Sequence, residues 1–253
     1  MKKFLFAATF ALFASTQAFA IIGVGAHYFM NTGSLGANSG DIQDGKITVK
    51  QESADGLQGL GFKLWIDFFP VIDIEGTFNI AASRYKTTLF FPAPIGKVPL
   101  SFPVEAPYSM LFDDASPIYG VATGDISVTY PFDIVPIITP YIGVGFSYFA
   151  STAVVDAGFV KEFVNDLDLS DPAALAALAD GGISKIIGDK VAEKIEKTGY
   201  ETGMGGHIIA GVRLKLPIIP IAAYANCKRY FGGNLSSRFN QGFAFEIGGG
   251  FAL

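Results

Sequence analysis

Two histidines, His27 and His207, and a single cysteine, Cys227, are the side chains of this 253-residue sequence best suited to catalysis or metal binding. A histidine beside a serine can activate the hydroxyl as a nucleophile, which is the chemistry that a lipid-modifying enzyme would need. Neither histidine lies in a recognisable serine-containing motif, and no group of His, Cys, Asp and Glu has metal-ligand spacing. We therefore expect no enzyme, no catalytic residue, no metal and no cofactor, and interpret both histidines as interior side chains with satisfied hydrogen bonds.

A second group with chemical potential consists of charged residues that recur at alternate positions within otherwise apolar segments. Such spacing places them on one face of an extended chain. Buried charges of both signs persist only when they are paired, so we expect a salt-bridge network in a protein interior. A gated path for ions or protons is the functional alternative. The group consists of Lys63, Asp67, Asp73, Glu75, Asp125, Arg213, Lys215 and Glu246.

The elements that must position these charges are β-strands, because apolar residues alternate with polar residues and glycine almost throughout the chain. Each apolar row is free of charge over roughly nine to eleven residues, the length that a tilted strand needs to cross a bilayer. A soluble β-sandwich would place its charges on the exterior, whereas here they share the row opposite the apolar one. Lipid cannot satisfy an open sheet edge, so the strands must close. We predict an all-β fold, a closed eight-stranded antiparallel transmembrane barrel, with strands from Ile22, Leu60, Ile72, Ile118, Ile142, Met204, Ile221 and Phe243.

Composition supports export to a membrane. The chain is 50% hydrophobic and only 16% charged, against about 25% charge in a soluble domain. Met1-Lys2-Lys3, a short apolar segment and Ala18-Phe19-Ala20 indicate a signal peptide over residues 1–20 and a barrel over residues 21–253; a buried N-terminal helix is the alternative. Removal of Lys2 and Lys3 changes the net charge from −5 to 16 − 23 = −7, and the sequence has no basic run, so we expect no nucleic-acid partner.

Short, proline-marked connections alternate with long ones, which we expect at about residues 31–56, 86–117, 151–200 and 233–240. This asymmetry is typical of outer-membrane barrels, whose long loops lie outside the cell. In the third loop, the spacing of apolar residues predicts a helix over Asp156–Leu167 and further helices to about Glu196. These helices could cap the barrel, or they could form an adhesin or receptor surface.

The second long loop is unusually apolar for a segment in contact with solvent. One interpretation is that the flanking strands continue above the membrane as a hairpin whose side chains pack on other loops. The other is a funnel that binds small hydrophobic molecules, since exposed apolar surface of this extent marks binding sites. The candidate ligand-binding residues are Phe90, Phe91, Phe102, Tyr108 and Phe112.

Two motifs resemble those of a known family. The segment Thr139-Pro140-Tyr141-Ile142-Gly143-Val144-Gly145 resembles the P-Y-x-G-x-G strand of eight-stranded outer-membrane proteins, which include OmpW-like barrels and the OmpA transmembrane domain. At the end of the chain, Glu246, Gly248, Phe251 and Leu253 resemble the signal read by the barrel-assembly machinery. The resemblance implies the outer membrane of a Gram-negative-type bacterium, with outer-membrane lipid and the assembly machinery as partners.

Three functions follow as expectations. The first is an integral outer-membrane protein with a structural or surface-interaction role and an interior plugged by its polar network. The second is uptake or binding of small hydrophobic molecules through the apolar second loop, as suggested for OmpW-like proteins. A lipid-modifying outer-membrane enzyme is the third.

Overall fold

The computed structural model describes residues 22–42, 44–45, 47–67, 71–95, 98–103, 117–132, 137–164, 200–216, 219–232 and 239–252. The expected signal peptide lies outside these residues, as do the expected helices of the third loop beyond Val164. No helix among the described residues combines the length and apolar character needed to cross a bilayer.

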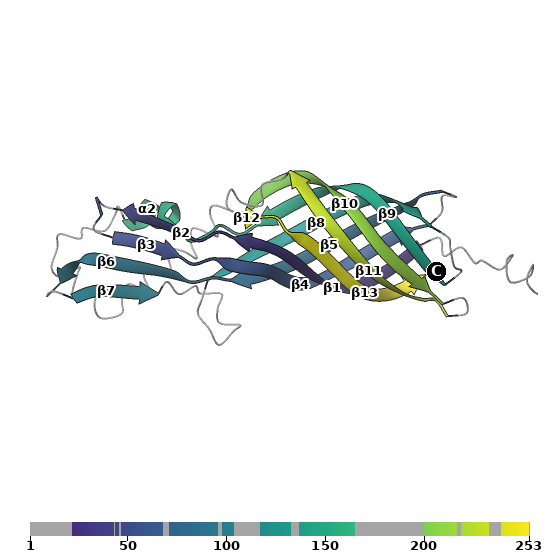
Figure 1. Cartoon of the computed structure of the whole chain (residues 1–253), viewed down its shortest axis with the longest axis horizontal. Helices are drawn as coiled ribbons and strands as arrows, with labels where there is room; N and C mark the ends of the chain where they lie inside the picture. The colour runs from purple at the N-terminus through teal and green to yellow at the C-terminus, as the bar shows by residue number, and fades with distance from the viewer. Residues whose placement is uncertain are drawn as a thin grey trace, which may run out of the picture.

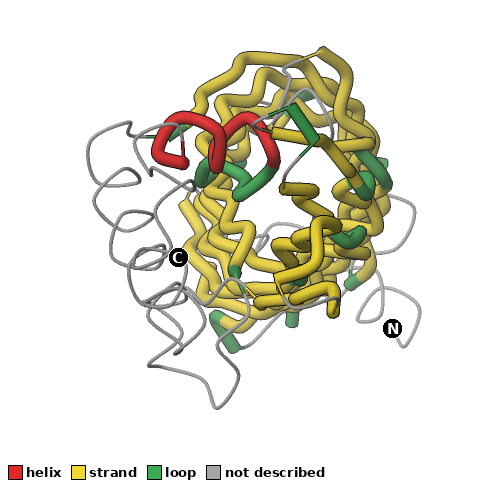
Figure 2. Tube along the Cα trace, turned by 90° about the vertical axis from the view of Figure 1, so that its left-hand side faces the viewer, coloured by secondary structure: helices red, strands yellow, loops and turns green. Residues whose placement is uncertain are grey.

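Eight long strands form a closed antiparallel barrel, which confirms the predicted fold. In spatial order they are β1 (Ile22–Leu35), β4 (Ala54–Ile66), β5 (Asp73–Arg84), β8 (Ile118–Pro131), β9 (Ile138–Ser151), β10 (Glu201–Lys215), β11 (Ile221–Gly232) and β13 (Phe243–Ala252). Closure comes from β1, which pairs with both β4 and β13. The short strand β12 (Phe239–Asn240) continues the pairing along β1. Viewed from the end of the molecule, the strands form a ring with the described helix at its rim (Figure 2).

The register around the barrel gives its dimensions. Ile22 of β1 pairs with a residue of β4, and each residue then pairs with one on the next strand around the barrel. This series is Ile22, Ile66, Ile74, Val128, Val144, Ile208, Arg229 and Phe243. Because Asn31 pairs with Ala244, Phe243 lies opposite Thr32, so one circuit advances 32 − 22 = 10 residues along β1. With standard strand rise and spacing, this stagger corresponds to a tilt of about 40° and a backbone radius of about 8 Å. A barrel of this radius has room for side chains but not for a wide aqueous channel.

The outward row of the barrel is apolar and exposed. Ten residues along β1 at this tilt span a height of about 25 Å, which matches the lipid-facing band of membrane barrels. Side chains in this band are mostly aliphatic or aromatic, and Tyr130 and Phe132 form an edge-to-face pair at the end opposite the described helix. The exposed set includes Val24, Leu60, Phe62, Ile80, Ile126, Val144, Phe146, Ile208, Ile247 and Phe251.

A second sheet lies beyond the barrel, on the left in Figure 1. Its strands are β2 (Asn38–Ile42), β3 (Ile47–Gln51), β6 (Thr87–Ile95) and β7 (Val98–Pro103), in the order β2-β3-β6-β7. We call it the extramembrane sheet. Asp44 and Gly45 take positive φ angles of 56° and 82° in the turn between β2 and β3, a conformation that Asp-Gly adopts readily in hairpins.

This sheet refines the expectation for the second loop. The loop contains a hairpin of β6 and β7, and β6 also pairs with β3 of the first loop; these strands are separate from β5, which ends at Arg84 before β6 begins at Thr87. Between β5 and β6, Tyr85 is buried and its hydroxyl accepts a hydrogen bond from the backbone nitrogen of Val155, at 2.8 Å. The region expected as a first loop over residues 31–56 likewise contains β2 and β3.

Helix α2 (Ala157–Val164) packs against β2 and β3. Asp156 caps its N-terminus, since its Oδ1 accepts a hydrogen bond of 2.8 Å from the backbone nitrogen of Phe159. The helix lies within the predicted span Asp156–Leu167. Buried residues of the helix and of the preceding segment cover the inner face of the extramembrane sheet.

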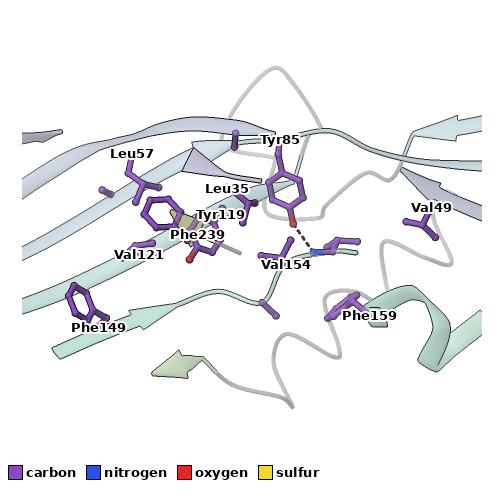
Figure 3. Close-up of a cluster of buried hydrophobic side chains, with 14 of the residues drawn as sticks. Leu35, Val49, Leu57, Tyr85, Tyr119, Val121, Phe149, Val154, Phe159 and Phe239 are labelled. Carbon is purple, nitrogen blue, oxygen red and sulfur yellow. Dashed lines mark hydrogen bonds between the residues drawn. The ribbon is translucent and has the colours of Figure 1, made fainter. Parts of the chain in front are cut away.

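One apolar cluster joins the two sheets (Figure 3). It begins inside the barrel, where Phe149 and Tyr230 meet edge to face and Tyr119 stacks on Phe239. It continues into the extramembrane sheet through Val49 and other buried side chains. We call it the upper apolar cluster; its members include Phe29, Leu35, Ile42, Ile47, Val49, Leu57, Tyr85, Leu89, Tyr119, Val121, Phe149, Val155, Phe159, Val160, Tyr230 and Phe239.

Candidate functional site

The interior of the barrel holds the candidate site, and its lower part is ionic. Arg213 of β10 contacts three carboxylates, with nitrogen–oxygen distances of 2.8 Å to Asp67, 3.2 Å to Asp73 and 2.5 Å to Glu75. Lys63 pairs with the other oxygen of Glu75 at 2.6 Å. Lys215, nearer the mouth, pairs with Asp67. These six residues, which the sequence placed on inward rows, are here called the lower ionic cluster.

A second group lies higher in the barrel. Lys228 of β11 pairs with Asp125 at 2.8 Å and with Glu246 at 2.6 Å, and all three side chains are fully buried. The hydroxyl of Tyr230 donates to Asp125 at 3.0 Å. We call Asp125, Lys228 and Glu246 the central ionic cluster. The four cations of the network therefore come from β4, β10 and β11, while the carboxylates come from β5, β8, β13 and the segment after β4.

Lys228 was missing from the residues selected on sequence. The signal was available, because Lys228 lies on the inward row of its strand with Tyr224 and Asn226. A single lysine near the end of a strand is easily assigned to solvent instead. The structure shows that it pairs with both Asp125 and Glu246, and His27 Nε2 lies 3.9 Å from Glu246 as well.

Hydrogen bonds connect the two clusters. Lys63 Nζ donates to the hydroxyl of Tyr141 at 3.0 Å, and that hydroxyl donates to Asn226. Asn226 in turn donates from Nδ2 to Glu246 at 2.8 Å. Polar contacts therefore run without interruption from Lys215 at one mouth to Tyr230 in the upper apolar cluster.

The two histidines occupy this interior with both ring nitrogens engaged. His27 lies 2.6 Å from Asn79 Oδ1 and 3.0 Å from the hydroxyl of Tyr224. His207 lies between two serines, with Nε2 at 2.8 Å from Ser127 and Nδ1 at 2.7 Å from Ser147. A neutral imidazole offers one donor and one acceptor, so one serine donates to the His207 ring and the other accepts from it.

The two serines beside His207 were not found from sequence, because they lie 80 and 60 residues away from it along the chain. A serine beside a histidine has the residue types of a nucleophile and its general base. However, Ser127 is 1% exposed and Ser147 is 0% exposed, so both serines are enclosed in the barrel interior. No group of three or more potential metal ligands gathers within the described part of the chain.

Glycines let the interior fill completely. Gly61 faces His27 in the β1–β4 register, and a Cβ added to it would lie 2.3 Å from the imidazole Nε2. Gly145 faces His207 in the same way, with 2.4 Å to the ring. The large inward side chains thus extend into space that glycines on the neighbouring strands leave open, which explains why glycine alternates with charge on the inward rows.

The remaining sequence-selected residues lie outside this interior or outside the described residues. Phe90 is half-buried on the face of β6 opposite Leu89, with Lys50 Nζ 5.4 Å from its ring centroid. Phe91 and Phe102 lie in β6 and β7, whereas Tyr108 and Phe112 are not among the described residues. In the C-terminal motif, Glu246, Gly248 and Phe251 lie in β13 and Leu253 is not described.

Together, the closed barrel, the exposed apolar band and the ionic interior define a transmembrane β-barrel. Comparison with protein-family models and with curated proteins found no match. Among solved structures, the outer membrane protein OprG from Pseudomonas aeruginosa aligns with a TM-score of 0.48 and 10% identity, over 91% of this chain and 94% of that one. Ail of Yersinia pestis gives 0.39 and 10%, over 91% and 96%, and Neisserial surface protein A gives 0.34 and 10%, over 92% and 97%. These scores and identities are low, so the class assignment depends on strand pairing and the distribution of polarity.

Proposed function

We propose that this chain is an integral outer-membrane protein with a closed, non-conducting barrel and a structural or surface-interaction role. The observation that carries the proposal is that ionic side chains and apolar side chains together fill the barrel interior. The two ionic clusters occupy its lower and central parts, and the upper apolar cluster fills the end nearest the extramembrane sheet. On this proposal the barrel anchors the extramembrane sheet and α2, which are presented outside the cell, and the chain is not an enzyme.

The outer-membrane location has its own support. The apolar band matches a bilayer, the expected signal peptide ends near Ala20, and Glu246, Gly248 and Phe251 lie in the last strand, where a signal for the barrel-assembly machinery would act. The sheet-bearing end carries the long connections, which face outside in bacterial outer-membrane barrels. Outer-membrane lipid and the assembly machinery are the partners that this proposal requires.

Conductance tests the closed interior. The purified, refolded chain is expected to give no stable single-channel steps in a planar bilayer, because paired charges and aromatic side chains fill the lumen. A matched positive control is an open porin inserted under the same conditions. Stable steps from this chain, at a frequency that rises with its concentration, would contradict the proposal.

Binding of small hydrophobic molecules is the second candidate. The feature that favours it is Phe90, which remains half-exposed on the face of β6 that does not pack against the upper apolar cluster. If a funnel exists there, Phe90→Asp and Phe112→Asp should each weaken the binding of a fluorescent alkyl probe several-fold, while Lys161→Gln on α2 should have no effect. Binding that is absent, or unchanged in both variants, would remove this candidate.

A further inference from the structure

Arg229 is a charged residue in an apolar position. It lies on the outward row of β11, where its register partners are Ile208 and Phe243, each 50% exposed. By the register count, its Cα lies about 6 Å below the upper edge of the apolar band. A cation on the lipid-facing side of a barrel is destabilising unless its head group reaches the interface.

The contacts of Arg229 direct its guanidinium towards that interface. Its Nη1 donates to the backbone oxygen of Gln241, at 2.8 Å, and Gln241 lies just beyond the sheet-side end of β13. Its Cζ lies 5.2 Å from the ring centroid of Phe243, over the aromatic face. The side chain is therefore held in one orientation at the boundary between hydrocarbon and head groups.

No described carboxylate pairs with Arg229. The three fully buried cations of the interior, Lys63, Arg213 and Lys228, each pair with at least one carboxylate. Within the described part of the chain, the contacts of Arg229 are the two above, and no described protein acceptor lies at its Nε and Nη2 donors. Its positive charge therefore has no carboxylate partner among the described residues.

The surface beside Arg229 suits an acyl chain. Gly206 pairs with Phe231 two register positions from the Ile208–Arg229 pair, so the outward row of β10 has no side chain at Gly206. The exposed side chains of Met204 and Phe231 border this gap, at 64% and 51%. A lipid lying there would bring its head group to the level of the guanidinium.

We infer that Arg229 binds the phosphate group of a lipid in the leaflet on the sheet side of the barrel. The guanidinium offers two adjacent donors, which match two phosphate oxygens. Gln241 and Phe243 orient the donors, and the acyl chain lies over Gly206. This inference rests on the proposed membrane location, and it names the lipid chemistry that one site on the barrel would select.

Native mass spectrometry of the full-length protein in detergent micelles tests the inference. The probes are bis-phosphorylated lipid A, the same lipid with both phosphates removed, and inorganic phosphate. The unsubstituted protein should retain the phosphorylated lipid at least tenfold more strongly than the dephosphorylated form. Arg229→Gln should abolish this preference, and Arg229→Lys should retain part of it because the charge remains without the paired donors.

Arg84→Gln is the matched control, because Arg84 lies on the outward row at the sheet-side end of β5, above the apolar band. It should leave the preference unchanged. Equal retention of both lipids, or an unchanged preference in Arg229→Gln, would overturn the inference. Displacement of the lipid by inorganic phosphate would show a site for a soluble anion and would also overturn it. Heat-modifiable gel migration of each variant reports barrel folding, so failure of lipid binding is distinguishable from failure of the membrane assignment.

Discussion

Replacing Lys228 by methionine is expected to destabilise the barrel by about 3–5 kcal/mol, the usual cost of removing one partner from a buried ion pair. The substitution leaves Asp125 and Glu246 buried without their lysine partner, since Lys228 pairs with both and is completely enclosed. The measurement is the free energy of unfolding in urea, with the protein inserted in lipid vesicles. If the cost arises from the orphaned charges, the triple variant Lys228→Met, Asp125→Asn, Glu246→Gln should recover most of it.

Lys215→Met provides the matched comparison. Lys215 pairs with Asp67, but its side chain is 32% exposed at the mouth and Asp67 keeps Arg213 as a partner. Ion pairs in contact with water contribute about 0–1 kcal/mol, so this variant should lose little. An equal loss in Lys228→Met and Lys215→Met would show that burial of the central ionic cluster has no energetic consequence.

Replacing Leu89 by aspartate should unfold the extramembrane sheet while the barrel remains folded. Leu89 is 1% exposed within the upper apolar cluster, and its register partner Val49 is equally buried. A buried, unpaired carboxylate at this position should cost more than about 4 kcal/mol, which exceeds what a small sheet can lose. Limited proteolysis of the vesicle-inserted protein should then cut between residues 87 and 103, whereas heat-modifiable migration should persist.

Thr88→Asp is the control for this prediction. Thr88 adjoins Leu89, lies on the opposite face of β6 and pairs with Lys50, so an aspartate there meets a base instead of the core. It should leave the proteolysis pattern unchanged. Loss of heat-modifiable migration in Leu89→Asp would mean that the barrel and the extramembrane sheet unfold as one cooperative unit.

The sequence by itself determined the barrel strands and the direction in which their side chains point. Alternation is a local property: once Phe62 and Leu64 face lipid, Lys63 must face the interior, because consecutive side chains of a strand point to opposite sides. The same reasoning located His27, Asp125 and Arg213 in the interior without knowledge of any neighbour. It also predicted α2, since the helical spacing of Val160 and Phe163 lies within one segment of chain.

Only the tertiary structure decided which of those interior groups meet. Arg213 and Asp67 are 146 residues apart, and His207 reaches Ser127 across 80; such contacts depend on strand order and on the ten-residue stagger, which no local pattern encodes. The extramembrane sheet has the same origin. Its strands β3 and β6 belong to different loops, and the reason for apolar residues in each becomes visible only when Val49 packs beside Leu89. Periodicity within one strand shows whether a side chain points inward or outward. Which residue it contacts depends on the register between strands, and this register is a property of the closed barrel as a whole.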